Sequence, residues 1–195
     1  MDKLIDDLIK LAFAEDIGDG DHTTLCCIPE TAMGKSQLII KEDGVLAGVE
    51  MAKRIFHDFD PELKMTVFIQ DGAEVKKGDI AFVVEGKIQS LLQTERLMLN
   101  VMQRMSGIAT TTRKYAKALE GTKTHVLDTR KTTPGMRMIE KEAVRIGGGM
   151  NHRIGLFDMI LLKDNHVDFA GGIEQAITRC LLYTSPSPRD PKTSR

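Results

Sequence analysis

The stretch DTRKTTPGMRMIEKEAVRIGGGMNHRIGLFDMILLKDNH, from Asp128 to His166, decides the fold and suggests the chemistry. Two short apolar runs within or beside it, HVLDTRK and FDMILLKDN, each lead into cationic residues. A strand that ends in a charged residue delivers that residue to the end of a sheet or barrel, where active sites lie. The pattern therefore predicts that several cations converge, which requires an anionic ligand to offset their repulsion. The residues expected to converge are Arg130, Lys131, His152, Arg153 and Lys163.

Around this stretch the chain alternates between strand and helix patterns. Residues 124–129 (THVLDT) and 159–164 (MILLKD) are strand candidates, whereas residues 135–146 and 173–180 have helical patterns. Strand–helix–strand order with short loops predicts parallel β/α units. A closed β/α barrel usually takes more than ~200 residues, so these units would be only the first part of one.

The N-terminal residues combine a helix with a loop. Residues 2–15 place apolar side chains at helical spacing, and the Gly- and Asp-rich residues 15–24 are typical of a loop. Asp19 and Asp21 in this loop lack the remaining ligand positions of a calcium loop, which disfavours a metal site there.

Residues 35–87 have a β-rich pattern that is punctuated by glycine. KSQLIIKEDGVLAGV predicts two strands joined in a hairpin at Asp43-Gly44, residues 51–59 predict a helix, and three short strands follow. This set resembles the small β-sandwich of lipoyl- and biotin-carrier domains. A carrier needs an exposed lysine at a hairpin tip, whereas Lys87 is followed by a helical stretch, so carrier function is disfavoured.

The helical stretch after Lys87 has an apolar stripe that is typical of core packing. Its members are Leu91, Leu92, Leu99, Met102 and Met105. Ser106-Gly107 predicts a break, with a second helix over residues 108–119. Arg96, taken alone, has the character of a solvated helix arginine.

These patterns predict an α/β fold in three regions. Residues 1–110 would form an N-terminal α/β sandwich domain, similar to a barrel sandwich, with a linking helix. Residues 111–180 would begin an incomplete α/β barrel that carries the catalytic site. The Pro- and Ser-rich residues 181–195 lack apolar periodicity, and we expect a disordered tail of foreign origin.

Composition excludes several functional classes. The formal net charge of -1, the absence of Trp and the presence of only two Tyr argue against a nucleic-acid partner. The acidic N-terminus lacks a long apolar core, so it predicts neither a signal peptide nor a membrane span, and favours a cytoplasmic protein. Cys26, Cys27 and Cys180 form no CxxC pair, and we expect them to be reduced and buried.

With these residues in view, the chain resembles the quinolinate phosphoribosyltransferases. The matching pieces keep their order up to about Arg179, and the most specific are SGIAT, DTRKTTPG, GGGMNHR and KDNH. A relative that acts in molybdenum metabolism shares parts of the pattern and is the main rival. The resemblance implies an N-terminal α/β sandwich domain followed by an α/β barrel.

The resemblance also implies an activity. It implies transfer of the phosphoribosyl group from phosphoribosyl pyrophosphate to quinolinate with decarboxylation, which gives nicotinate mononucleotide for NAD synthesis. Mg²⁺ would assist, and the enzyme would be a homodimer in which Arg96 reaches the partner's site. By motif match, Lys131 and Lys163 would be catalytic, and the metal ligands stay open. The substrate-binding residues would be Arg96, Thr129, Arg130, Lys131, His152, Arg153 and Lys163.

The sequence also departs from this family. Acidic residues on later barrel strands, which would hold ribose and metal, have no counterpart after Cys180. The alternative is therefore a non-catalytic fragment of the enzyme, and we expect the 195-residue chain alone to be poorly stable and catalytically silent. In the whole enzyme, Arg153→Ala should weaken quinolinate binding more than Arg113→Ala, provided that Arg113 is exposed.

Overall fold

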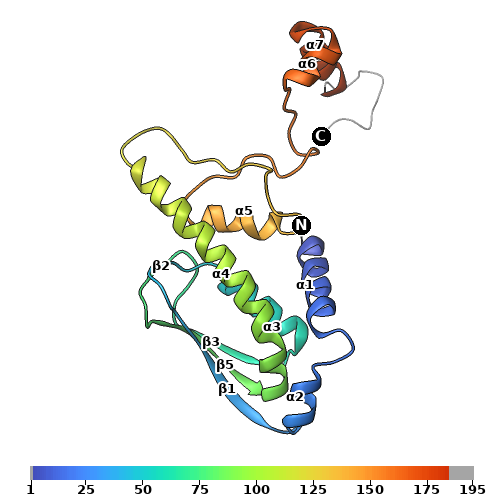
Figure 1. Ribbon diagram of the computed structural model, residues 1–195. Coiled ribbons are helices and arrows are strands. Elements are labelled where there is room, and N and C mark those ends of the chain that lie inside the picture. Colours follow the sequence, from blue (N-terminus) through green and yellow to red (C-terminus); the bar gives the residue numbers. More distant parts are fainter. Residues whose placement is uncertain (1, 185–195) are drawn as a thin grey trace, which may run out of the picture. The chain divides into compact units, whose positions relative to one another are not determined.

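The computed structural model describes residues 2–184 and divides the chain into two compact units (Figure 1). Unit 1 comprises residues 1–152 and unit 2 comprises residues 153–195. None of the helices in residues 2–184 combines the length and the apolar character that a membrane crossing requires.

Unit 1 contains a three-stranded antiparallel sheet in the order β1-β5-β3. The strands are β1 (Met33–Ile39), β3 (Lys64–Val67) and β5 (Ile80–Lys87). The central strand β5 is buried from Ala81 to Val84, so its apolar run forms the sheet side of the core. The edge strands place Lys35 and Lys64 opposite Glu85, and such edge lysines discourage pairing with other chains.

A second, two-stranded sheet pairs β2 (Gly44–Val45) with β4 (Glu74–Val75). The predicted hairpin at Asp43-Gly44 is therefore wrong, because β1 pairs with β5 and β2 pairs with β4. The three later strands are confirmed as β3, β4 and β5.

Three helices precede the long helix of unit 1. They are α1 (Asp2–Ile17), α2 (His22–Cys27) and α3 (Val49–Phe59). The predictions for α1 and α3 are confirmed, but the predicted loop over residues 15–24 contains the start of α2. Asp21 makes this helix possible, because its carboxylate accepts the Thr24 backbone N–H at 3.0 Å.

Helix α4 (Ile88–Ala118) is continuous over 31 residues, so the predicted break at Ser106-Gly107 is wrong. The Ser106 hydroxyl bonds outward to the backbone of Ala47, accepting its N–H at 3.0 Å and donating to its carbonyl at 3.1 Å. Thr110 accepts the Val45 N–H at 2.9 Å. The polar residues of the SGIAT motif therefore bind the backbone around β2 and leave the helix intact.

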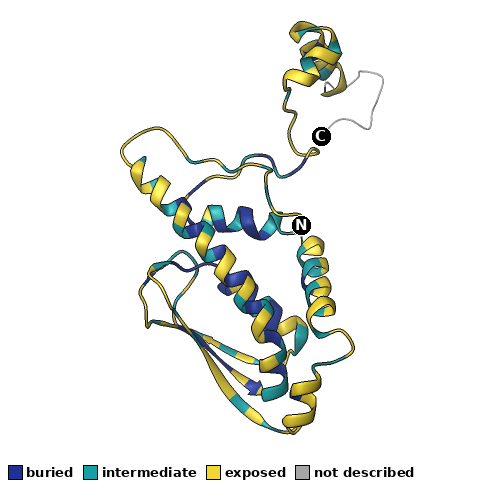
Figure 2. Ribbon diagram, in the orientation of Figure 1, coloured by how far each residue is buried: buried dark blue, intermediate teal, exposed yellow. Residues whose placement is uncertain are grey.

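Helix α5 (Arg137–Ile146) packs on α4 and completes the core of unit 1. Figure 2 shows buried residues along α3, α5, β5 and one face of α4. The helices α4 and α5 approach closely at Gly147, where an added Cβ would lie 2.5 Å from the carbonyl oxygen of Ala109. The predicted strand over residues 124–129 is reduced to one parallel bridge between Leu127 and Met150.

Unit 2 contains α6 (Asp164–Ala170) and α7 (Ile173–Thr184) within its described residues. The predicted strand over residues 159–164 is wrong, because residues 159–163 form no strand or bridge with any of the described residues and α6 begins at Asp164. The helix expected over residues 173–180 is confirmed. The tail predicted to be disordered starts inside α7, since residues 181–184 are helical, while residues 185–195 lie outside the described part.

Candidate anion-binding site

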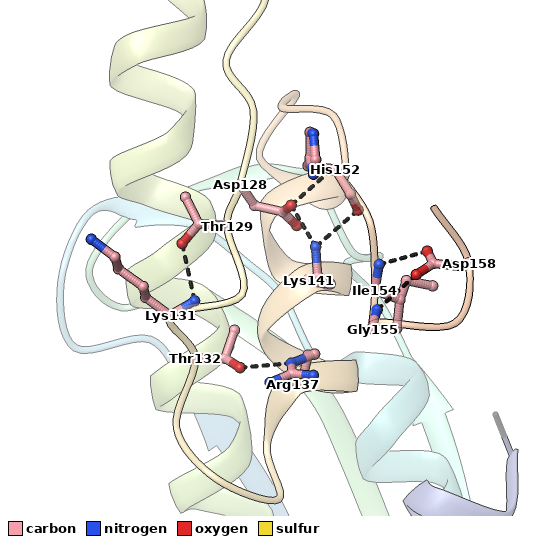
Figure 3. Close-up of polar contacts among 10 residues, drawn as sticks. All are labelled: Asp128, Thr129, Lys131, Thr132, Arg137, Lys141, His152, Ile154, Gly155 and Asp158. Atoms are coloured by element: carbon pink, nitrogen blue, oxygen red, sulfur yellow. Dashed lines mark hydrogen bonds and ion pairs between the residues drawn. The ribbon is translucent and has the colours of Figure 1, made fainter. Parts of the chain in front are cut away.

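A buried ion pair organises the loop that carries the predicted cations. The Lys141 ammonium on α5 lies 2.5 Å from the Asp128 carboxylate, and the two side chains are 2% and 6% exposed. The same carboxylate oxygen accepts the backbone N–H of His152 at 2.8 Å, and Lys141 donates to the backbone carbonyl of His152 at 3.0 Å. Figure 3 shows Lys141 between Asp128 and His152. The Asp128–Lys141 ion pair therefore binds both the backbone N–H and the backbone carbonyl of His152, a predicted site residue.

Asn151 adds to this network. With its amide oriented to satisfy both neighbours, the side-chain nitrogen donates to the Lys141 carbonyl and to the second Asp128 oxygen, each at 2.9 Å. Asp128 is thus surrounded by donors from α5 and from residues 151–152, which compensates its removal from water.

The predicted substrate-binding residues Thr129, Arg130 and Lys131 follow Asp128 directly. The Thr129 hydroxyl accepts the Lys131 backbone N–H at 3.1 Å, which makes a tight turn. Arg130 carries a buried Nε that has no hydrogen-bond partner among residues 2–184, whereas Lys131 is exposed. A buried guanidinium nitrogen without a partner is costly, so this position is suited to an acceptor from an anionic ligand.

Thr132 and Thr133, at the other end of the loop that begins at Asp128, are also hydrogen-bonded to helices α4 and α5. Arg104 on α4 donates from Nε to Glu140 of α5 at 2.7 Å and from Nη2 to the Thr133 hydroxyl at 2.5 Å. Glu140 also accepts the backbone N–H of Thr133 at 3.3 Å. Arg137 donates to the Thr132 hydroxyl at 3.0 Å, as drawn in Figure 3. We call residues 128–133 the cationic loop.

Unit 2 carries the other two predicted cations. Arg153 is buried and donates from Nη1 to the carbonyl of Met159 at 3.3 Å. Asp158 shapes the intervening turn by accepting the backbone N–H groups of Ile154 and Gly155 (Figure 3). Lys163 is exposed and precedes α6. The convergence of these two cations with the cationic loop stays a prediction.

Arg96 is exposed on α4 and lines a hollow of about 680 Å³ beside residues 38–46. It precedes Arg104 by eight residues, which corresponds to about 12 Å along the helix axis. The structure therefore does not bring Arg96 to the cationic loop of its own chain.

Arg113→Ala was expected to have little effect on quinolinate binding provided that Arg113 is exposed, and the structure does not meet this condition. Its Nε donates to the Gly147 carbonyl at 3.0 Å, and its Nη2 donates to the carbonyls of Ile146 and Gly72 at 3.3 and 3.4 Å. Arg113 is half-buried and binds the C-terminal end of α5, so Lys114, which is exposed, is the better control.

Among the described residues, the cysteines and acidic groups form no metal centre. The expectation of buried thiols is wrong for Cys26 and Cys27, which are exposed with sulfurs 3.5 Å apart, and Cys180 is half-buried. All three are free thiols, as expected. Within residues 2–184, no three His, Cys, Asp or Glu side chains are placed to hold a metal ion.

Comparisons with known proteins place these features in a family. Residues 21–106 match the model of the quinolinate phosphoribosyl transferase N-terminal domain, and residues 108–187 match that of its C-terminal domain. The chain belongs to the quinolinate phosphoribosyltransferase family. The two matched regions meet near residue 107, inside α4.

Named relatives of this family come from plants and bacteria. The chain is 48% identical over 177 residues to quinolinate phosphoribosyltransferase [decarboxylating] 1 of Nicotiana glauca, covering 90% of this chain and 50% of that protein. It is 43% identical to a probable nicotinate-nucleotide pyrophosphorylase [carboxylating] of Synechocystis, with 95% and 62% covered. The chain spans about half the length of the plant relatives that it matches.

Solved structures of the family confirm the α/β fold class. NadC from Streptococcus pyogenes superposes with a TM-score of 0.87 at 41% identity, covering 94% of this chain and 65% of that one. The enzyme from Francisella tularensis gives 0.83 at 37% identity, covering 94% and 64%. The expected boundaries at residues 110 and 180 stay predictions.

Proposed function

We propose that the intact enzyme transfers the phosphoribosyl group of phosphoribosyl pyrophosphate to quinolinate, with loss of carbon dioxide, giving nicotinate mononucleotide for NAD synthesis. The observation that carries the proposal is the buried Nε of Arg130, which has no partner among residues 2–184 and lies on a loop inside the family-matched region. The names of the Nicotiana and Oryza relatives support the reaction class.

The proposed roles follow from the charges of the substrates. Quinolinate has two adjacent carboxylates, which the forked guanidinium groups of Arg130 and Arg153 suit, whereas Lys131 and Lys163 act as point charges on carboxylate and phosphate. Thr129 adds a hydroxyl beside them, and His152 orients the site.

The chemistry requires stabilisation of charge at two stages. Positive charge develops at the ribose anomeric carbon while pyrophosphate leaves, so fixed cations near the leaving group lower the barrier. Once the ring nitrogen carries ribose, its positive charge stabilises the carbanion left by decarboxylation. Mg²⁺ would neutralise pyrophosphate. The described residues offer no three-ligand cluster for this ion, so we assign none of them to it.

The assay is release of carbon dioxide from quinolinate by the intact enzyme, which should require phosphoribosyl pyrophosphate and Mg²⁺. Arg130→Ala should raise the quinolinate KM about tenfold or more, because a charge-assisted bond contributes ~1.5–3 kcal/mol. Lys114→Ala is the matched control and should behave as wild type. Preferred turnover of nicotinic acid would contradict the proposal. Failure to turn over either pyridine carboxylate would contradict it as well and would favour the molybdenum-related rival. The same assay on residues 1–195 tests the alternative of a non-catalytic fragment.

We also propose a homodimer in which Arg96 completes the partner's site. Support comes from its exposure on α4, about 12 Å along the helix from Arg104. Mixing inactive Arg96→Ala and Lys131→Ala chains should restore about a quarter of wild-type activity, because half of the dimers are mixed and each has one intact site. No recovery after subunit exchange would place Arg96 outside the shared site.

The cytoplasm is the proposed compartment, with no nucleic-acid or membrane partner. The free thiols of Cys26, Cys27 and Cys180 support this, because thiols stay reduced in that compartment. Several plant relatives are named as chloroplastic or mitochondrial, so cell fractionation of the native protein is the test.

A further inference from the structure

Helix α5 contacts the cationic loop at both of its ends. Lys141 binds Asp128, the first residue of the loop, and Glu140 accepts the backbone N–H of Thr133, the last residue. Because these two side chains are adjacent in sequence, they leave the helix in different directions. They therefore fix both ends of the loop from a single turn of helix.

The contact at the first end is removed from water, and at the second end the Glu140 side chain is largely buried while its partner Arg104 is 41% exposed. Lys141 is 2% exposed and Asp128 6% exposed, while the Glu140 side chain is 10% exposed and lies 2.5 Å from Nη2 of Arg104. Charges in such places need their partners, since an unpaired buried charge is strongly unfavourable. Thr132 is also fixed, because its hydroxyl accepts a hydrogen bond from Arg137. Within the loop, Thr129, Arg130 and Lys131 therefore lie between fixed residues, Asp128 on one side and Thr132 on the other.

The same ion pair fixes a second segment of the site. Asp128 accepts the N–H of His152, and Lys141 donates to its carbonyl. The spacing between the cationic loop and residue 152 is therefore set by the Asp128–Lys141 pair.

We propose that Glu140 and Lys141 are positioning residues of the anion-binding site, which set the location of Arg130, Lys131 and His152 without touching the substrate. This inference rests on the proposed function for the identity of the ligand. The Lys141 ammonium is engaged by a carboxylate and a carbonyl inside unit 1, which separates its role from that of the exposed Lys131.

The test compares two variants of the intact enzyme with two matched controls. Asp128→Asn/Lys141→Met removes both charges of the buried pair, so that neither is left unpaired, and Glu140→Gln removes the charge at the other end. Lys117→Met alters an exposed lysine that pairs with Glu74, and Glu142→Gln alters a half-buried glutamate on α5 that pairs with Arg145. Quinolinate binding is measured by titration calorimetry, and steady-state kinetics give KM and kcat.

Hydrogen–deuterium exchange, followed by mass spectrometry, and thermal melting give readouts that need no ligand. In both test variants we expect quinolinate Kd and KM to rise about 10- to 100-fold, with a smaller change in kcat. Exchange should increase in residues 126–136 and, for the double variant, also in residues 148–153. The melting temperature should stay within about 4 °C of wild type. The controls should match wild type in every readout.

Three outcomes would overturn the inference. The first is quinolinate affinity within twofold of wild type in both test variants. The second is faster exchange throughout the chain with a matching fall in melting temperature, which would indicate a general structural role. The third is unchanged exchange in the cationic loop. If wild-type enzyme does not bind quinolinate, the proposed function fails, and exchange alone decides: a local increase supports positioning and no increase overturns it.

Discussion

Two glycine-to-alanine substitutions should change the stability of unit 1 in opposite directions. Gly107 lies inside α4, and an added Cβ would meet nothing within 4 Å. Alanine loses less conformational freedom than glycine in a helix, so Gly107→Ala should stabilise the protein by about 0.5–1 kcal/mol.

Gly147 has an ordinary helical φ of -70°, so backbone strain adds nothing to the cost of Gly147→Ala. A Cβ at this position would lie 2.5 Å from the Ala109 carbonyl oxygen and 2.7 Å from the Thr112 Cβ. The helices α4 and α5 would have to separate, which costs ~1–3 kcal/mol for overpacking. The hydrogen bond from Arg113 to the Gly147 carbonyl would be disturbed as well. We therefore expect a loss near 3 kcal/mol.

Thermal unfolding followed by circular dichroism measures both effects. For a chain of this size, ~1 kcal/mol corresponds to about 2–4 °C, so Gly147→Ala should melt about 6–12 °C below wild type and Gly107→Ala about 2 °C above it. A Gly147→Ala protein that melts at or above wild type would refute the close approach of α4 and α5. A clear fall for Gly107→Ala would refute the continuous helix.

Three further predictions concern single hydrogen-bonding groups. The Ser90 hydroxyl donates to the Asp60 carboxylate at 2.6 Å and lowers the pKa of that carboxyl. The stability that this hydrogen bond contributes to the folded state is therefore fully present above the ordinary Asp pKa, and it is lost as the pH falls through the lowered pKa. Ser90→Ala should therefore reduce the free energy of unfolding at pH 6, and urea titrations should show the difference shrinking below about pH 4; a difference independent of pH would contradict this assignment. Asp71→Ala should cost ~1–2 kcal/mol in urea unfolding, because Asp71 accepts the Val49 N–H at 2.8 Å at the start of α3; an unchanged midpoint would argue against this cap. Arg113→Ala should lower the melting temperature by several degrees, because three carbonyls lose their donor, whereas Lys114→Ala should change it little; equal melting temperatures would show that Arg113 does not hold α5.

The helices α3 and α5 were predictable because their apolar periodicity is strong, and α1 was predictable although its periodicity is weaker. The errors arise where distant residues decide local structure. The Asp43-Gly44 hairpin fails because Gly44 lies against Thr110, where a Cβ would approach the hydroxyl to 2.7 Å, and β2 pairs with β4. Ser106 has a local tendency to disturb a helix, but its hydroxyl bonds to Ala47 instead.

The candidate site was predictable only in part. The sequence placed Arg130 and Lys131 together at the end of a predicted strand that includes Thr129, because a basic motif there follows an apolar run. It gave no signal for the contact between Asp128 and Lys141, since a separation of 13 residues has no helical or strand period. The predicted strands at 124–129 and 159–164 failed because a strand is defined by its pairing, which their own sequences do not supply.

The bonds at both ends of the cationic loop have an entropic consequence for ligand binding. Ordering the backbone of a flexible residue costs about 1–2 kcal/mol, and a free loop would meet this cost each time a dicarboxylate bound. Here Asp128, Thr132 and Thr133 are ordered as the chain folds, which leaves three residues to adjust. Much of the conformational entropy is therefore lost once, on folding. Under the proposed function, the affinity of each binding event would then keep more of the attraction between the cations and the anion.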